Sequence, residues 1–500
     1  MPDLNRTAYQ ELIDTWREAS LLGSCGAVLG WDERTFMPPA AAPHRAKQIA
    51  LLAKLGHGMV TTSRVGELLE QLRVAPLGES EAANVREIRR THDRAVKLPA
   101  SLVEEIAQVT SEAQGVWQQA KQANDFPKFQ PWLEKILKLK RQEAACVGYK
   151  ESPYDALIDE FEPGATAANI RSLFADLAHE LNPLVAAIAD RMPKPRLDLA
   201  TRTFPVAAQE KLCRDIAAAI GYDFNAGRLD TTAHPFCTGI GPGDVRILTR
   251  YHEHRPLESF FGTLHEAGHG LYEQGLPAEN FGTPLGVAAS FGVHESQSRL
   301  WENQVGRSRE FWDGFAPKFR ATFAPSVDDA SVDDFWLAAN VVRRSLIRID
   351  ADEVTYNLHI VLRFELEAAL MEGDLEAAGL PEAWNQRFKQ FFGLDVPDDA
   401  HGCLQDIHWS FGGIGYFPTY TLGNLLAAQL MEKANADNPG LAEDIKNGQF
   451  NRLTEWLRQN VHRHGQRYRP AELCERVTGR PLSSKPFLDY VRTKFAAWCA

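Results

Sequence analysis

The chain has 500 residues, of which 44% are hydrophobic and 24% are charged, as is usual for a globular protein. Its formal net charge of −12 at pH 7 argues against a nucleic-acid partner, because phosphate contacts require a dense positive surface. No apolar run reaches the roughly 18 residues that a membrane helix needs, and the polar N-terminal segment lacks the features of a secretion signal. We therefore expect no membrane partner.

The seven cysteines are odd in number, dispersed along the chain and without CxxC spacing. This pattern fits neither a disulfide framework nor a cysteine zinc site, and it predicts reduced thiols. Together with the absence of a secretion signal, the cysteine pattern makes the cytoplasm the expected location.

Apolar residues at three- and four-residue spacing dominate the chain, which is typical of amphipathic helices. The clearest helical patterns are, in chain order, Thr7–Leu22, Ala46–Leu72, Leu102–Gln122, Pro127–Cys146, Ala167–Ala189 and Asp352–Met371. The few strand-like segments lie near Asp230–Cys237, Val245–Tyr251 and Gly286–Phe291. No linker, charge block or repeat divides the chain. The sequence therefore predicts a mainly α-helical single domain over residues 1–500, with one small β-sheet in the middle of the chain.

The segment HEAGH carries the most specific chemical signal in the sequence. Its surroundings have helical apolar spacing, so His265 and His269 should lie one turn apart on one face and share a metal ion. Glu266 should lie beside them, off the ligand face, where it can act as the general base. With 15 histidines in the chain, chance accounts for fewer than roughly 0.06 such motifs. Gly268, between the histidines, indicates a close approach to the helix at this position.

A catalytic zinc site needs a third protein ligand and one open position. Gly275 stands where the metzincin pattern requires a third histidine, so that subclass is excluded. The remaining candidates are Glu273, Glu279, Glu295 and Glu302. Glu295 is preferred because it lies in an apparent helix, HESQSRLWENQ, that can cross the first one. Glu302 is the alternative, although its pattern fits a solvated helix carboxylate better.

Seven short motifs stand in a characteristic order: WDERTFMPP at Trp31–Pro39, HPF at His234–Phe236, HEAGH, HESQ at His294–Gln297, IRIDAD at Ile347–Asp352, GCLQDIHW at Gly402–Trp409 and VHRHG at Val461–Gly465. In this order and spacing, over nearly the whole chain, the sequence resembles the carboxypeptidase Taq family of metallocarboxypeptidases. The resemblance implies a helical, gluzincin-like domain with a small sheet beside a deep active-site groove. It also implies that the glutamate of HESQ, Glu295, is the third zinc ligand.

Residues for the remaining chemistry lie farther along the chain. Hydrolysis requires donors for the tetrahedral oxyanion, and the glycine-rich segment after GCLQDIHW offers His408, Tyr416 and Tyr420. Similar helical peptidases use a downstream histidine and tyrosine, so we expect His408 and Tyr420 to be catalytic, with Tyr416 contacting the substrate. A terminal carboxylate calls for a bidentate cation, and the resemblance places Arg348 of IRIDAD in the groove.

Several further residues have weaker assignments. His234 of HPF is a candidate to contact the substrate or to orient a ligand, and a structural role is equally compatible with its motif. Arg246 matches the family pattern DXRXT, but Leu248 replaces the expected threonine and Thr249 follows it. Asp352 and Asp406 are candidates to orient the arginine or the imidazoles. His462 and His464 are two residues apart, cannot face one ligand from a helix, and are expected to be structural.

The resemblance implies a zinc-dependent carboxypeptidase that removes single C-terminal residues from peptides with a free C-terminus. It implies broad side-chain tolerance, poor action at C-terminal proline and a homodimer. Zinc or cobalt would suit the His/His/Glu ligands. One alternative is an oligopeptidase or dipeptidyl-type enzyme of the same helical build. The other is a non-catalytic helical binding protein, which the complete set of metal ligands disfavours.

Overall fold

The computed structural model describes residues 2–499, so Met1 and Ala500, the two ends of the predicted domain, lie outside the described residues. The helices before the sheet are α1 (Pro2–Glu33), α2 (Ala42–Val60), α3 (Ser63–Leu72), α4 (Glu79–Lys97), α5 (Ala100–Ala123), α6 (Phe126–Val147), α7 (Pro153–Phe161), α8 (Ala167–Arg191) and α9 (Val206–Ala219). Those after it are α10 (Pro256–Gly275), α11 (Phe291–Arg299), α12 (Arg309–Phe323), α13 (Val332–Ala339), α14 (Tyr356–Glu372), α15 (Leu380–Phe392), α16 (Pro418–Asp437), α17 (Leu441–Lys446), α18 (Asn451–Asn460), α19 (Pro470–Thr478), α20 (Lys485–Lys494) and α21 (Ala496–Cys499). The prediction of a mainly helical chain with a small sheet is confirmed.

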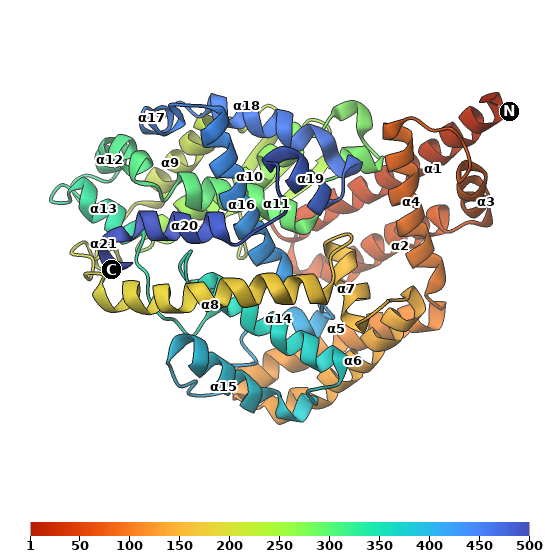
Figure 1. The fold of residues 1–500 in the computed structure, drawn as a ribbon, viewed down its shortest axis with the longest axis horizontal. Helices are drawn as coiled ribbons and strands as arrows, with labels where there is room; N and C mark the ends of the chain where they lie inside the picture. Colours follow the sequence, from red (N-terminus) through yellow and green to blue (C-terminus); the bar gives the residue numbers. More distant parts are fainter. Residues whose placement is uncertain (1, 500) are drawn as a thin grey trace.

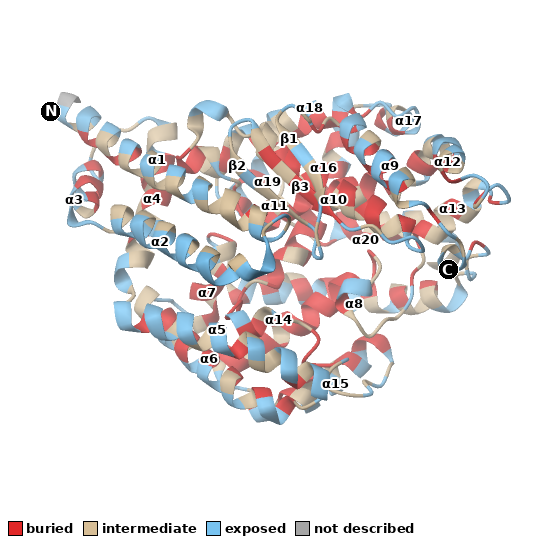
Figure 2. Ribbon diagram, turned by 180° about the vertical axis from the view of Figure 1, so that it is seen from behind, coloured by how far each residue is buried: buried red, intermediate tan, exposed pale blue. Residues whose placement is uncertain are grey.

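Most helices pack around two hydrophobic cores that share α16, and α1, α3 and α4 enclose a third, smaller core (Figure 1). One hydrophobic core joins α5 to α8 with α14 and α15, and the other joins α9, α10, α12 and α18. Leu425 of α16 belongs to the first core and Leu430 to the second, so this helix has little polar surface. Figure 2 shows buried residues gathered on α10, α14 and α16, whereas α2 at the edge is largely exposed. Among residues 2–499 we find no helix that combines the length and apolar character needed to span a bilayer.

The sheet has three strands, β1 (Gly227–Thr231), β2 (Phe236–Gly241) and β3 (Asp244–Thr249), in the order β1-β3-β2. The central strand β3 pairs parallel with β1 and antiparallel with β2. Two of the predicted strand regions are thus confirmed, although the first of them spans parts of β1 and β2 and the turn between them.

The third predicted strand, Gly286–Phe291, is wrong. Val287 and Ser290 have extended backbone angles, but this segment pairs with no strand among the described residues. The Ser290 hydroxyl instead accepts a hydrogen bond from the backbone N–H of Val293 and caps α11. A short apolar run in an extended conformation looks the same in sequence whether or not a partner strand exists.

The long helical patterns are confirmed, with two corrections: one pattern is divided into two helices, and another begins later than predicted. Ala46–Leu72 is two helices, because Thr62 ends the first pattern and caps α3 through its side chain. Asp352–Met371 becomes helical only at Tyr356, since the Asp352 carboxylate accepts hydrogen bonds from the N–H groups of Val354 and Thr355.

Helices α10 and α11 cross at backbone contact distance. A Cβ atom built on Gly268 would lie 2.6 Å from the carbonyl oxygen of Gln297 and 2.7 Å from the Cα of Ser298. On the other side of α11, a Cβ on Gly423 of α16 would lie 2.7 Å from the Cβ of Glu295. The close approach expected at Gly268 is therefore confirmed, and α11 is held between two glycine contacts.

Replacing Gly268 with alanine should lower the free energy of unfolding by about 1–3 kcal/mol, because the added methyl group forces α10 and α11 apart. The matched control is Gly262→Ala on the same helix, where the new Cβ would lie an ordinary 3.5 Å from the Thr249 hydroxyl. That control should be neutral or up to about 1 kcal/mol more stable, as alanine favours helix. Urea unfolding measures both. Equal effects from the two substitutions would contradict the close-contact argument.

Candidate functional site

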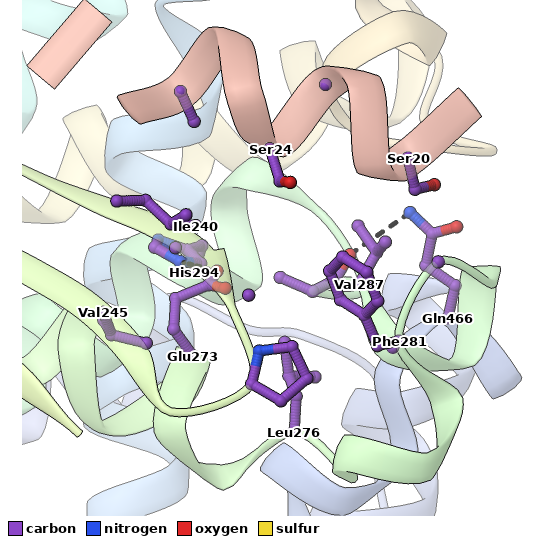
Figure 3. Close-up of a pocket in the computed structure, with 18 of the residues that line it drawn as sticks. Ser20, Ser24, Ile240, Val245, Glu273, Leu276, Phe281, Val287, His294 and Gln466 are labelled. Atoms are coloured by element: carbon purple, nitrogen blue, oxygen red, sulfur yellow. Dashed lines mark hydrogen bonds and ion pairs between the residues drawn. The ribbon is translucent and has the colours of Figure 1, made fainter. Parts of the chain in front are cut away.

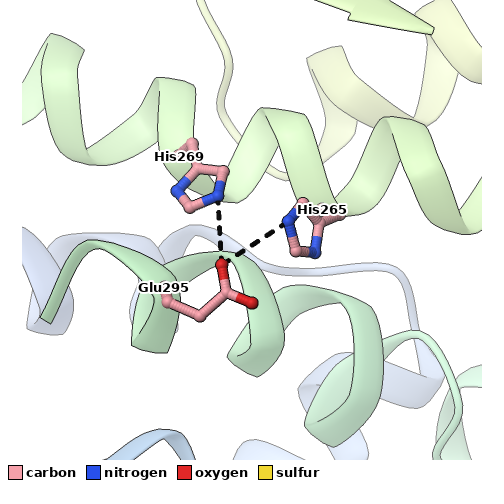
Figure 4. A group of neighbouring side chains, drawn as sticks. All are labelled: His265, His269 and Glu295. Atoms are coloured by element: carbon pink, nitrogen blue, oxygen red, sulfur yellow. Dashed lines mark ion pairs between the residues drawn. The ribbon is translucent and has the colours of Figure 1, made fainter. Parts of the chain in front are cut away.

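Three possible metal ligands converge where α10 crosses α11. The donor atoms of His265, His269 and Glu295 all lie within 4.8 Å of one another (Figure 4). The Glu295 Oε2 atom is 3.4 Å from His269 Nε2 and 3.7 Å from His265 Nε2. Ligands about 2.1 Å from one tetrahedral cation are about 3.4 Å apart, so nitrogen and oxygen donors at these separations fit a zinc-type ion with one open position.

Glu302 fixes the orientation and tautomer of His265. Its Oε2 atom is 3.0 Å from His265 Nδ1, and it also pairs with Arg299 at 3.1 Å and Arg307 at 3.2 Å. Burial alone would raise the pKa of Glu302, but Arg299 and His265 hold this pKa well below its usual range. An ionised Glu302 must accept the hydrogen bond, so His265 carries its proton on Nδ1 and presents the Nε2 lone pair to a metal.

The expectation that Glu302 is a solvated helix carboxylate is therefore wrong. Its side chain is 12% exposed, and it lies in Leu300–Val305, a π-helical continuation of α11, a form that recurs at functional sites. Glu302 also does not replace Glu295 beside the two Nε2 atoms. Arg299 lies four residues after Glu295, and Glu302 lies seven residues after Glu295. This spacing places the three side chains on one face of a helix, and it could have predicted that they pair with one another.

Glu295 is held by its own helix. Arg299 Nε donates to Oε1 at 2.7 Å and the Ser298 hydroxyl donates to Oε2 at 3.1 Å. Although burial acts in the opposite direction, Arg299 and His265 keep the pKa of Glu295 well below its usual range. The carboxylate is thus ionised, with Oε2 directed toward both imidazoles.

Glu266 occupies a different environment from the other two glutamates. It is buried on α10 beside His265, and burial, reinforced by the charge of Glu295, raises its pKa to about 7. A carboxyl group that titrates near neutrality can both accept and return a proton.

His408 and two tyrosines form a second group near the metal ligands. His408 Nε2 is 3.3 Å from the Tyr420 hydroxyl, and the Tyr416 ring lies 5.4 Å from the Tyr420 ring. Burial lowers the pKa of His408 to about 3 and raises that of Tyr416 to about 12. The charge of Glu295 also raises the pKa values of both tyrosines, so their hydroxyls are within its electrostatic reach and remain protonated donors.

The loop that carries His408 is tied to the core by Glu367, which sequence reasoning missed. This α14 carboxylate is fully buried and accepts hydrogen bonds from Trp409 Nε1 at 2.7 Å, the Gly415 N–H at 3.0 Å and the Tyr154 hydroxyl at 2.5 Å. Glu367 is one of three glutamates in α14, and nothing in the sequence distinguishes it or indicates partners so far along the chain.

Arg348 lies in a 3-10 turn, Arg348–Asp350, rather than in a regular helix. Its Nε and Nη2 atoms are 3.0 and 2.7 Å from Asp406 Oδ1, and Nη1 donates to the Tyr356 hydroxyl at 2.9 Å. Asp406 also pairs with the fully buried Arg363 at 2.7 Å. The structure thus joins Asp406 to the arginine, and two of the five guanidinium N–H donors remain beyond these bonds.

Other predicted residues are not brought to the metal ligands by any contact in the described part of the chain. His234 is exposed in the turn between β1 and β2, and Arg246 pairs with Asp244 at 2.8 Å and lies over the Trp31 ring. Leu248 is fully buried in β3, so its replacement of threonine serves the core. Asp352 contacts backbone N–H groups rather than Arg348.

His462 explains the glycine at position 275. A Cβ on Gly275 would lie 2.5 Å from His462 Nδ1, so the imidazole occupies the space beside the end of α10. His462 Nε2 is 2.9 Å from the Gln297 side-chain oxygen, which ties the VHRHG segment to α11.

A cavity of about 620 Å³ is lined by Glu273 and His294 and by none of the three possible metal ligands. Figure 3 shows His294 and Glu273 on its inner side and Ser20 and Ser24 of α1 opposite them. The His294 ring stacks on the ring of His269 at 4.4 Å, so the cavity begins directly beside a metal ligand.

Substituting Glu302 with glutamine should weaken metal binding by about 10- to 100-fold, because the amide no longer provides a charged acceptor for His265. The dissociation constant can be measured on metal-free protein by competition with a chelator of known affinity. Glu310→Gln, a helix glutamate outside this network, is the control and should bind metal as the unmodified protein does. Unchanged affinity in Glu302→Gln would show that Glu302 does not support the site.

Comparisons with known proteins identify the family of the chain. The family model for carboxypeptidase Taq (M32) metallopeptidases matches residues 11–495. Thermostable carboxypeptidase 1 of Thermus thermophilus is 47% identical, and carboxypeptidase 1 of Bacillus subtilis 37% identical, each over 98% of both chains. The crystal structure of an M32 carboxypeptidase from Deinococcus radiodurans superposes with a TM-score of 0.96 at 43% identity over 99% of both chains. The chain therefore belongs to the carboxypeptidase Taq (M32) family and is a metallocarboxypeptidase.

Proposed function

We propose that the enzyme uses zinc, with cobalt as an effective substitute, to remove single residues from the free C-terminus of peptides, with broad side-chain tolerance and poor action at C-terminal proline. The observation that carries this proposal is the His265, His269 and Glu295 cluster with Glu266 beside it. Imidazole and carboxylate donors accommodate either metal. When bound, the metal would polarise the scissile carbonyl and make a water molecule more acidic.

The residues of the chain supply the remaining chemistry. Glu266 removes a proton from the attacking water and returns it to the leaving amine. The Tyr420 hydroxyl and His408, 3.3 Å apart, donate hydrogen bonds to the developing oxyanion, and Tyr416 borders the substrate. Arg348 binds the terminal carboxylate through the two N–H donors that are not used in its hydrogen bonds to Asp406 and Tyr356.

The charges around Arg348 favour this role. Arg348 and Arg363 share a single carboxylate, Asp406, so this buried cluster carries one excess positive charge. A substrate carboxylate would complete the pairing in an environment of low dielectric constant. The same cluster gives an oligopeptidase no comparable advantage, because internal peptide bonds offer no such charge.

A homodimer and a cytoplasmic location remain part of the proposal. All seven cysteines are free in the structure, which suits a reducing compartment. Sedimentation of the purified enzyme tests the dimer.

The central experiment follows one free-ended peptide and its C-terminal amide by mass spectrometry, with and without chelator. We expect stepwise loss of single residues from the free-ended peptide only, and no reaction with chelator present. Efficient cutting inside either peptide would favour the oligopeptidase. Failure to cleave any peptide after zinc or cobalt addition would favour the binding protein.

Glu266→Gln should retain the metal and lower kcat by about 10²- to 10⁴-fold, because glutamine cannot take the proton. Metal content and kcat are measured on the same preparation. Glu258→Gln, on the first turn of the same helix with a side chain that is 33% exposed, should keep both values. Loss of metal from Glu266→Gln would contradict the general-base assignment.

Arg348→Ala should raise KM by about 10- to 100-fold for substrates with a free carboxylate, which corresponds to the loss of a charge-assisted bidentate contact. Asp406 keeps Arg363 as its partner in this variant, so the fold should survive. Kinetics on matched free and amidated peptides separate the outcomes. An equal loss on both would make Arg348 a structural residue.

A further inference from the structure

The two histidines on α10 are oriented by different means. His265 is held by a hydrogen bond from Nδ1 to Glu302, the usual device for a metal-binding imidazole. The Nδ1 atom of His269 is buried and has no hydrogen-bond partner among the described residues. Some other contact must therefore fix the ring of His269.

That contact is an aromatic stack. The ring of His294, the first residue of HESQ, lies 4.4 Å from the ring of His269 with an interplanar angle of 21°. His294 directly precedes Glu295, so the helix that brings the third ligand also brings this ring. Stacked rings at this distance attract each other beyond their burial and favour one relative orientation.

His294 is itself fixed by Glu273. Its Nε2 atom is 2.9 Å from Glu273 Oε1, and Glu273 follows His269 by one turn on α10. The β2 backbone confines the carboxylate, since a Cβ on Gly239 would lie 2.5 Å from Glu273 Oε2. Figure 3 shows both side chains together at the cavity wall. The pair is thus placed by α10, α11 and the sheet at once.

The stack continues away from the metal ligands. Tyr272 lies 5.5 Å from His294 and 5.1 Å from His462, with an interplanar angle of 31° in both cases. Tyr272 is anchored by the Ala289 N–H, which donates to its hydroxyl at 3.0 Å, and His462 by Gln297. Four rings from α10, α11 and the VHRHG segment therefore form one column.

We propose that His294, held by Glu273 and backed by Tyr272 and His462, is a positioning residue that orients His269 for metal binding through ring stacking. This inference rests on the proposed function only in taking His265, His269 and Glu295 as the metal ligands. It assigns a role to HESQ beyond its glutamate, and to the VHRHG motif far along the chain.

The test is metal affinity, measured on metal-free protein without substrate by competition of zinc, and separately cobalt, with a chelator. His294→Ala removes the ring and should weaken binding by about 10- to 100-fold, as loss of an orienting partner usually does. His294→Phe keeps the stack and should regain most of the affinity. Glu273→Gln keeps the ring of His294 but replaces its charged hydrogen-bond partner, and should lose less metal affinity than His294→Ala. The visible spectrum of the cobalt form should change in His294→Ala and resemble the parent in His294→Phe.

His401→Ala is the matched control. His401 forms the same kind of pair, 2.7 Å from Asp398, at an exposed position away from the metal ligands, and its loss should leave the affinity unchanged. Circular dichroism establishes that each variant is folded, and His294→Phe and Glu273→Gln keep the test valid if His294→Ala fails to fold.

The proposal is overturned if His294→Ala binds both metals as tightly as the parent, or if His294→Phe loses as much affinity as His294→Ala. Because no peptide enters this experiment, its outcome is separate from that of the carboxypeptidase assay. An enzyme that needs His294 for metal binding but cuts internal bonds would overturn the proposed specificity and support this inference.

Discussion

The backbone contact between α10 and α11 is the constraint on which the site depends. Gly268 lets the two helices approach so closely that the carbonyl of Gln297 fills the position of a side chain. At a normal interhelical distance of about 8–10 Å, a glutamate on α11 would not lie between two histidines on α10. The three ligand donors within 4.8 Å are a direct consequence of this crossing. Gly423 of α16 makes a second close contact with α11 at Glu295, which restricts movement of α11 away from α10.

Charges buried around this crossing are paired in a way that assigns a protonation state to each group. Arg299 is shared by Glu295 and Glu302, and both carboxyls are kept ionised against the effect of burial. Glu266 lies nearby without such an arginine, and its pKa rises toward neutrality. Removing one partner of a buried pair costs about 3–5 kcal/mol of folding stability, because the other charge is then buried without a partner. One helix crossing thus supports two ionised carboxylates and one that can exchange a proton.

The second half of the molecule presents its groups to the first through loops rather than helices. Arg348 and His408 lie in 3-10 turns, and each turn is anchored by a buried carboxylate, Asp406 for Arg348 and Glu367 for the His408 loop. Helix α16 takes part in both hydrophobic cores. Tyr420, near the start of this helix, is therefore held in a fixed position relative to Arg348 and His408. The position of the three possible metal ligands relative to Arg348 therefore depends on this shared helix.

Features of the fold and of the site that depend on interactions between residues close in sequence could be predicted from the sequence. Helical spacing predicted the long helices, and HEAGH placed His265, Glu266 and His269 on one turn because the interactions within a helix span only four residues. Gly268 predicted a close approach to α10, although not which segment makes it. The extended segment at Gly286–Phe291 was misread as a strand, because pairing depends on a distant partner that a local pattern does not contain.

Contacts between segments far apart in the chain became visible only in the folded protein. The sequence pattern of Glu302 fitted a solvated carboxylate, but the fold places it against His265 of α10. Likewise, the sequence showed no partner for Glu367, and the fold brings Trp409 and Gly415 to it. His462, expected to be structural, supports α11 and occupies the space beside Gly275. Local sequence patterns were sufficient to identify the residues that could bind a metal and act as a base. The fold decided how each one is oriented and charged, because burial and long-range pairing exist only once the helices have packed.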